Sequence, residues 1–514
     1  MANSFGRVAA AKAAALMTGS TYVSYGLGIV VSALIARDLG PADYGRYAYV
    51  VWMSGVLVVI ATAAFNTTAI RFISQSIGRD DSAQARAVHH RIRSGLWIGI
   101  LGTAAAFVAM TLLDPPAGWS GIVTWFIAAT LASFGIKAAY LFDTSVAKGW
   151  GRFTVEAYSM ISVTLLNAIG VCALALRHSS LEAYLVMFSV TSLGYFLFGA
   201  TLLRRAGISP SAGELPEGLR AQIRKHSLWT LVLGVSGVLG NRSFETYLLG
   251  RGFGSADVGF FAIATALVRG ATDLFTVGLS TVLMPAMAQA IGRQDHARVN
   301  LILSEAMRYF VFVGLLIGGV GCLWASPLIT LMYGHKYDAV VPLFRVLLLV
   351  AAATVSEGAF GALLTTTDRQ TVRATIALGS IALSAVTAFT LVPRFGLEGA
   401  VTSAVIARLL YFATLIVVIG RGWKISWPLG RMARLALGAL LALVVALPGS
   451  VLLRNPWVDL VDGGLYAVAF LVMSIKVGAW SAEDATMALK LLERIPRIPK
   501  HWTRAIERWR DARA

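Results

Sequence analysis

The stretch Arg37-Asp-Leu-Gly-Pro-Ala-Asp-Tyr-Gly-Arg-Tyr-Ala48 lies between the first two apolar runs of the chain. It recurs 214 residues later as Arg251-Gly-Phe-Gly-Ser-Ala-Asp-Val-Gly-Phe-Phe-Ala262, with six of its twelve positions identical. A second pair of segments, Ile70–Asp81 and Met284–Asp295, matches at the same offset. Two matches at one offset, each at the same place relative to apolar runs, indicate an internal duplication.

The repeated motif is predicted to be a turn that joins two membrane spans in each half of the chain. Its glycines are expected to serve tight backbone geometry, Gly40 and Gly45 in the first copy and Gly254 and Gly259 in the second.

Composition predicts an integral membrane protein. Hydrophobic residues make up 57% and charged residues 14% of the 514 positions, whereas a soluble domain carries about a quarter of charged residues. Apolar runs of about twenty residues recur along the chain, each long enough to cross a hydrocarbon core of about 30 Å as a helix. A membrane β-barrel would instead show short segments of alternating polarity. We therefore expect an all-α polytopic membrane protein.

Fourteen spans can be placed. They cover residues 17–36, 47–69, 94–113, 119–142, 156–176, 182–203, 227–250, 259–283, 306–330, 340–366, 372–392, 397–419, 433–453 and 460–480. The first six match the second six, and because six is even both copies enter from the same side of the membrane. We therefore predict two six-helix lobes related by a pseudo-two-fold axis along the membrane normal, plus two extra C-terminal helices.

This division assigns each part of the chain a role. The segments are an N lobe at 1–204, a cytoplasmic linker at 205–226, a C lobe at 227–420, the two extra spans within 421–480, and a basic amphipathic cytoplasmic tail at 481–514. The tail opens with Ser481-Ala-Glu-Asp484, which resembles a capping box. The rest of the tail is either a helix lying on the inner leaflet or a disordered basic segment.

The net charge of +18 reflects how the chain is oriented in the membrane. With the N-terminus in the cytoplasm, 31 of the 44 Lys and Arg residues fall in inward segments and 7 in outward loops. This positive-inside distribution predicts cytoplasmic N- and C-termini in a bacterial inner membrane, and it favours contact with anionic membrane lipids. No soluble basic domain exists to bind nucleic acid, so no nucleic-acid partner is expected.

No catalytic constellation is visible, and the His, Cys, Asp and Glu spacing of a metal site is absent. A polytopic polysaccharide polymerase or ligase would need a large outward loop with catalytic Arg or His, whereas the outward loops here are short. We therefore predict a protein that is not an enzyme and that works through its spans. A non-transporting scaffold of a polysaccharide assembly complex stays open.

Ionisable residues inside spans are the best functional pointers, because each is costly in lipid. They are Lys137, Arg242, Glu245, Arg269, Asp273, Arg345, Glu357, Arg408 and Lys476. The six bases against three acids favour an anionic substrate, such as a phosphate-bearing lipid, over a cationic drug.

Two local clusters stand out among these residues. The first is Asn241, Arg242 and Glu245, in which Glu245 is four positions from Asn241 and three from Arg242, and the second is Arg269 and Asp273, four positions apart. Either cluster could be a self-neutralising group that only makes the helix tolerable in the bundle. Glu357 has no local basic partner, so it must be protonated, paired across helices or bound to a cation.

The chain resembles the polysaccharide flippases (Wzx type) of the multidrug/oligosaccharidyl-lipid/polysaccharide exporter superfamily. The motifs that carry the resemblance run through the first twelve spans. They are Leu39-Gly-Pro-Ala-Asp-Tyr-Gly-Arg-Tyr47, Glu245-Thr-Tyr-Leu-Leu-Gly-Arg-Gly-Phe-Gly-Ser-Ala-Asp-Val-Gly-Phe-Phe261, Met284-Pro285, Tyr337-Asp-Ala-Val-Val-Pro-Leu-Phe-Arg345 and Phe395-Gly-Leu-Glu-Gly-Ala400.

The resemblance implies two facing lobes that carry undecaprenyl-diphosphate-linked sugars between leaflets by alternating access. Family members commonly have an acid in the span where Glu245 stands, and related transporters place a coupling-cation site in the second lobe. The cation-coupling candidates are Glu245, Glu357 and Asp273, with Na⁺ or H⁺ as the coupling ion, and no cofactor is expected. Glu245 and Glu357 could share one site.

By the same resemblance, a substrate-binding cavity would involve Arg242, Arg269, Arg408, Lys137 and Asn241. The expected function is export of lipid-linked oligosaccharide for surface polysaccharide or exopolysaccharide assembly. The expected transport unit is a monomer that works beside polymerase or export machinery.

Two alternatives from the same superfamily stay open. One is a cation-coupled drug antiporter, which would favour acids in the spans of the first lobe. The other is a peptidoglycan-precursor lipid flippase, some of which carry basic residues in the first span, where Thr18–Ala36 has none.

Overall fold

The computed structural model describes residues 7–119, 121–240, 243–366, 370–422, 425–453, 456–481, 483, 484, 486 and 511. Within these ranges the regular structure is helical. The first half of the chain forms α1 (Arg7–Thr62), α2 (Asn66–Gly78), α3 (Ser82–Leu113), α4 (Val123–Gly149), α5 (Thr154–Leu176) and α6 (Leu181–Arg205). A short 3₁₀ turn, η1 (Ala117–Trp119), lies between α3 and α4.

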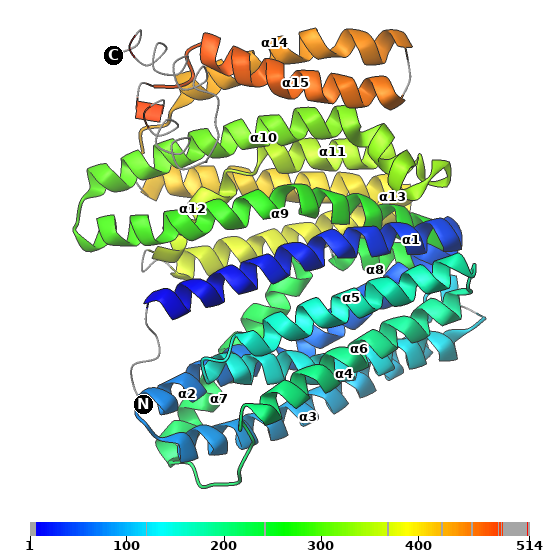
Figure 1. Ribbon diagram of the computed structural model, residues 1–514, viewed down its shortest axis with the longest axis vertical. Helices are drawn as coiled ribbons and strands as arrows, with labels where there is room; N and C mark the ends of the chain where they lie inside the picture. The colour runs from blue at the N-terminus through cyan, green and yellow to red at the C-terminus, as the bar shows by residue number, and fades with distance from the viewer. Residues whose placement is uncertain are drawn as a thin grey trace. The chain divides into compact units, whose positions relative to one another are not determined.

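The second half repeats the pattern and adds a final hairpin (Figure 1). Its helices are α7 (Glu217–Leu239), α8 (Ser243–Gly252), α9 (Ser255–Gly292), α10 (His296–Tyr333), α11 (Val340–Ala353), α12 (Glu357–Thr366), α13 (Gln370–Gly422), α14 (Leu429–Leu453) and α15 (Pro456–Lys476). A 3₁₀ turn, η2 (His335–Tyr337), separates α10 from α11.

Two of these helices are long enough to cross a membrane twice, and each breaks at a glycine. The candidate span in α1 is Gly19–Thr62, with 44 residues, and that in α13 is Ala374–Gly422, with 49, against about 20 for one crossing. Gly40 breaks α1 with φ 75° and ψ 175°, and Gly396 breaks α13 with φ 57° and ψ −127°. Both lie in the φ range that only glycine adopts readily, so the glycine positions decide where the chain turns back.

The fold class predicted from the sequence is confirmed. Among the described residues, nine helices are long and apolar enough to span a membrane, and the bent pair of α11 and α12 makes a tenth. Counting α1 and α13 twice gives twelve crossings, and α7–α8 and α9 carry the remaining two predicted spans. The protein is a multi-pass helical membrane protein with about fourteen crossings.

Apolar side chains also cover parts of the helix surfaces, as lipid contact requires. On α3, Ile98 is 74% exposed and Leu101 is 67% exposed. Such residues would be costly in water, whereas in a bilayer they face hydrocarbon.

The two copies of the repeated motif touch each other. A Cβ added to Gly45 would overlap the carbonyl oxygen of Ser255, and one added to Gly259 would lie 3.1 Å from the Cα of Gly45. Gly45 and Gly259 are equivalent positions of the duplication. The motif arginines hold the adjacent loop, with Arg46 Nε donating to Gly118 O at 2.9 Å and Arg251 pairing with Asp114 at 2.7 Å.

The chain divides into two compact units. The first comprises Met1–Leu267, Thr330–Val340 and Ala377–Ala407, and the second Val268–Ile329, Val341–Ile376 and Arg408–Ala514. The lobe boundaries expected from the sequence remain a prediction. In the second unit α14 and α15 lie side by side (Figure 1), and their inner faces share an apolar core with α10 that includes Leu323, Leu435, Tyr466 and Phe470.

Candidate functional site

Glu245 lies in the first turn of α8. Its side chain is fully buried. Carboxylate oxygen Oε1 accepts a hydrogen bond from Ser403 Oγ at 2.9 Å and lies 3.5 Å from Ser384 Oγ. Hydroxyl groups are suitable partners both for a carboxylate and, with it, for a small cation.

The two serines come from opposite sides of the break at Gly396. Ser384 lies in the first half of α13 and Ser403 in the second. Thr387 Oγ1 lies 2.9 Å from Ser403 Oγ and so joins the two halves of this helix. Glu245 with these hydroxyls forms a polar cluster in the first unit, which we call the Glu245 cluster.

Arg408 and Glu357 form a second charged site, in the second unit. Arg408 Nη2 lies 2.9 Å from Glu357 Oε1, and Arg408 Nε donates to Thr354 Oγ1 at 3.0 Å. Thr354 lies in the three-residue turn between α11 and α12, where the chain direction bends by 47°. The requirement that Glu357 be protonated, paired or cation-bound is therefore met by an arginine from another helix.

Lys137 belongs to a polar network in the first unit. Its Nζ lies 4.7 Å from the centroid of the Tyr195 ring, a distance at which the ring face attracts a cation. The Tyr195 hydroxyl bonds Thr164 Oγ1 at 2.8 Å, and Thr164 lies 3.3 Å from Ser24 Oγ. This network links α4, α6, α5 and α1 around one span cation.

The other predicted site residues are only partly covered by the described structure. Asn241 and Arg242 lie outside the described residues, and so does the side chain of Asp273. Arg269 is described on α9, where its side chain is exposed.

The shared Glu245–Glu357 site stays a prediction. Glu245 lies in the first unit and Glu357 in the second, and the contacts above give each carboxylate partners within its own unit. The partners that the structure describes are hydroxyls for Glu245 and a guanidinium for Glu357.

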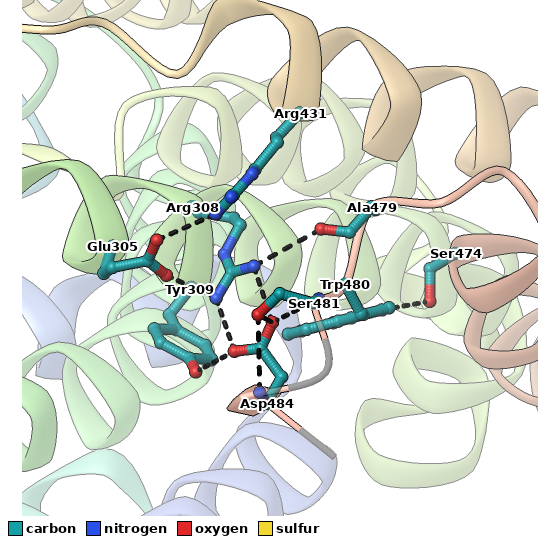
Figure 2. Close-up of polar contacts among 9 residues, drawn as sticks. All are labelled: Glu305, Arg308, Tyr309, Arg431, Ser474, Ala479, Trp480, Ser481 and Asp484. Carbon is teal, nitrogen blue, oxygen red and sulfur yellow. Dashed lines mark hydrogen bonds and ion pairs between the residues drawn. The ribbon is translucent and has the colours of Figure 1, made fainter. Parts of the chain in front are cut away.

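A fourth polar cluster, which the sequence did not reveal, surrounds Arg308 on α10 (Figure 2). The Arg308 side chain is 1% exposed. Its Nη1 and Nη2 contact Asp484 Oδ2 at 2.7 Å and Oδ1 at 2.5 Å, and Glu305 also pairs with it. The guanidinium carbon lies 5.0 Å from the Tyr309 ring and 5.3 Å from the Trp480 ring. We call this group the Arg308 clasp.

The clasp also confirms the capping box expected at the start of the tail. Ser481 N donates to Asp484 Oδ2 at 2.7 Å, and Asp484 N donates to Ser481 Oγ at 3.4 Å. Burial alone would raise the pKa of Asp484, but hydrogen bonds from Arg308, Ser481 and Tyr309 lower that pKa to about 2. Asp484 is therefore ionised at neutral pH and ties the end of the α15 segment to α10.

Among the described residues, no group of three His, Cys, Asp or Glu side chains could hold a metal ion. The polar span groups described above are carboxylates, hydroxyls, guanidiniums and the Lys137 ammonium. This set can bind anions and small cations and can exchange protons.

Comparison with protein-family models gives two matches that together cover most of the chain. A model described as polysaccharide biosynthesis protein matches residues 10–291, and one described as lipid II flippase MurJ matches residues 203–473. A lipid III flippase from Escherichia coli (strain K12) is 23% identical over 431 residues, which is 78% of this chain and 96% of the relative. The same figures hold for a lipid III flippase from Shigella flexneri.

Solved structures share the fold. The lipid II flippase MurJ in an inward closed conformation aligns with a TM-score of 0.71 and 13% identity, over 88% of this chain and 97% of that one. An inward-facing multidrug resistance MATE family transporter of the MOP superfamily aligns with a TM-score of 0.63 and 14% identity, over 77% and 94%. The chain belongs to the polysaccharide biosynthesis protein family, among the lipid-linked oligosaccharide flippases of the multidrug/oligosaccharidyl-lipid/polysaccharide exporter superfamily.

Proposed function

We propose that this protein is a secondary transporter that flips an undecaprenyl-diphosphate-linked oligosaccharide from the inner to the outer leaflet of a bacterial inner membrane. Transport proceeds by alternating access, driven by a cation, and supplies surface polysaccharide or exopolysaccharide assembly. The similarity to the lipid III flippases, which extends over 96% of their length, supports this substrate class. The excess of basic residues within spans supports an anionic cargo.

The observation that carries the proposal is the burial of Glu245 among hydroxyls. A carboxylate in a low-dielectric interior is stable only when it is paired, hydrogen-bonded or neutralised. Ser403 and Ser384 supply oxygen atoms from both halves of α13. A cation that enters or leaves this cluster would therefore change the contacts among α8 and the two halves of α13. That change is the step that couples the cation gradient to the movement of helices.

The test is Glu245→Gln in the full chain, because glutamine keeps the shape of the side chain and removes its charge. The measurement is the amount of lipid-linked sugar that accumulates on the inner leaflet of a strain whose own copy is deleted. We expect at least a ten-fold loss of flipping with normal membrane insertion.

Glu398→Gln is the matched control, because Glu398 is exposed on the same helix that supplies the serines. We expect it to behave as wild type. Polysaccharide output that is unchanged in Glu245→Gln would remove Glu245 from the mechanism. Ser403→Ala should fall between the two variants, since it removes one of the hydroxyl partners.

The coupling ion is Na⁺ or H⁺, and proteoliposomes separate the two. A Na⁺ gradient at constant pH should drive uptake if the Glu245 cluster binds Na⁺. A pH gradient in Na⁺-free buffer should drive it if Glu245 carries a proton. Glu245→Gln should abolish the response to the effective gradient in either case.

A second candidate is flipping of the peptidoglycan precursor, favoured by the match of residues 203–473 to the lipid II flippase model. The absence of Lys and Arg from residues 18–36 weighs against it. Complementation decides between the two. Rescue of a strain depleted of its lipid II flippase would support this candidate, and rescue of only a strain lacking an oligosaccharide-lipid flippase would support the first.

A cation-coupled drug antiporter is the remaining alternative from the superfamily. It would raise the resistance of a drug-sensitive strain to cationic compounds. We expect no such rise for this chain, because its span charges favour an anionic cargo.

A further inference from the structure

The pair of Arg408 and Glu357 is held differently from a buried structural ion pair. Arg408 Nη2 lies 2.9 Å from Glu357 Oε1, and Arg408 Nε donates to the Thr354 hydroxyl at 3.0 Å. The two side chains are 35% and 24% exposed. Because Arg408 Nε is directed to Thr354, this pair lacks the two-point contact through Nε and Nη2 that makes arginine–carboxylate pairs strong.

Both acceptors of Arg408 lie at the turn between α11 and α12. The turn between α11 and α12 places Thr354, at its start, and Glu357, just after it, beside the same guanidinium. An unbroken helix would carry both residues on nearby faces but would not bend by 47° between them. Arg408 therefore has one neutral acceptor and one charged acceptor at this turn.

We propose that Glu357 is a resident counterion of Arg408, which the diphosphate group of the substrate displaces when it binds. This inference rests on the proposed function, since it assumes a diphosphate-bearing lipid as cargo. A diphosphate offers several anionic oxygens to the planar guanidinium, so it competes well with one carboxylate oxygen. The exposure of the pair gives the incoming anion access to the guanidinium.

A displaceable counterion also makes release easier. An arginine with no competitor would hold a diphosphate tightly, and a transporter must release its cargo on the far side. Glu357 returns to Arg408 as the diphosphate leaves, so the positive charge does not remain unpaired in the bundle. The pair thus sets an intermediate affinity, which transport needs in both directions.

The distinguishing test exploits the opposite roles of the two partners. The probe is farnesyl diphosphate, with farnesol as the uncharged comparison, and binding is measured on the purified full-length protein in nanodiscs. Arg408→Gln should weaken diphosphate binding about ten-fold or more, because it removes the anchor. Glu357→Gln should strengthen binding about three- to ten-fold, because it removes the competitor, while flipping slows. Farnesol binding should change in neither variant.

Arg345→Gln is the matched control. Arg345 lies on α11 of the same unit, and its Nε donates to the backbone oxygen of Cys322 at 2.9 Å. We expect diphosphate affinity to stay unchanged in this variant. A purely structural ion pair would give the same sign of effect in both Arg408→Gln and Glu357→Gln, and that result would overturn the inference.

The double variant Arg408→Gln/Glu357→Gln keeps the test valid if one single variant does not fold. It removes both charges together, so the fold keeps its charge balance, and its diphosphate affinity should equal that of Arg408→Gln. Affinity restored to the wild-type level would contradict the role of Arg408 as anchor. If the wild-type chain does not bind the probe, the inference fails whatever the flipping assay shows. If the probe binds with opposite shifts while no sugar lipid is flipped, the proposed function fails instead.

Discussion

The second unit contains two arginine–carboxylate pairs that differ in contact geometry and in burial. In the Arg308 clasp, both guanidinium Nη atoms meet both oxygens of Asp484, and Tyr309 and Ser481 add hydrogen bonds to the same carboxylate (Figure 2). Arg308 is 1% exposed, whereas Arg408 is 35% exposed and meets one oxygen of Glu357.

This difference separates a pair that fastens the fold from a pair that can exchange partners. A buried pair with several hydrogen bonds is costly to open, because removal of one partner leaves the other charge buried and only partly compensated. A partly exposed pair contributes less to stability, and in the inference above another anion replaces its carboxylate. The following predictions test this distinction, beginning with the largest expected effect.

Ending the chain after Trp480 should cause the largest loss of stability. It removes Ser481 and Asp484 and leaves Arg308 buried without its two-point partner, at a cost of about 3 to 5 kcal/mol. Thermal unfolding of the purified protein in detergent measures this. A chain that ends after Thr486 keeps the clasp, so it should melt near the full-length value and still transport. Equal melting of the two truncated chains would show that the clasp does not fasten the tail.

Asp484→Asn should destabilise the protein by about 2 to 4 kcal/mol, somewhat less than truncation, because the amide still accepts some hydrogen bonds. Glu483→Gln removes a neighbouring exposed charge and serves as the control. The two variants should be compared by the same melting assay, and similar melting temperatures would contradict the special role of Asp484.

The Arg308 clasp should open only at low pH. The folded-state pKa of Asp484, at about 2, lies below its ordinary value of 3.8. A depressed pKa gives stability that is fully present above about pH 4 and is lost as the pH falls through about 2, with a total of about 2 kcal/mol. The difference in melting temperature between wild type and Asp484→Asn should therefore be constant from pH 7 to about pH 4 and shrink below it. A difference that already disappears near pH 6 would refute this assignment.

The smallest effect is expected at the exchangeable pair. A double-mutant cycle with Arg408→Gln and Glu357→Gln should give a coupling energy in stability of about 1 kcal/mol or less. The same cycle measured on diphosphate binding should show a much larger coupling. A stability coupling near 3 kcal/mol would place this pair in the same class as the Arg308 clasp.

The sequence revealed much of the fold because membrane spans are a local property. Runs of about twenty apolar residues are visible one at a time, and the duplicated motif locates the halves without any knowledge of packing. The positions at which α1 and α13 turn back are also local, since Gly40 and Gly396 adopt backbone angles that favour glycine. The break between α11 and α12 was not predicted: residues 340–366 were placed as one span, although Thr354, Ser356 and Gly358, which favour turns, lie at the break.

The partners of the span charges could not be predicted, because they depend on contacts between distant segments. Glu245 was identified as a costly acid, but Ser384 and Ser403 are 139 and 158 residues away from it. Arg308 lay at the edge of a predicted span and was counted with the inward basic residues, so its burial was not anticipated. The capping-box pattern at Ser481 was visible, yet nothing nearby showed that Asp484 also binds an arginine 176 residues earlier.

The contact between Gly45 and Gly259 has a consequence for how such a chain is assembled. Equivalent positions that meet each other form a self-complementary interface, of the kind by which two identical subunits make a symmetric dimer. Here both copies belong to one polypeptide, so their association is intramolecular and occurs at an effective concentration that does not depend on expression level. Fusion also allows each copy to change independently, as the acids Glu245 and Glu357 in the second half illustrate. The contact between Gly45 and Gly259 thus corresponds to the interface of a symmetric dimer, formed within a single chain.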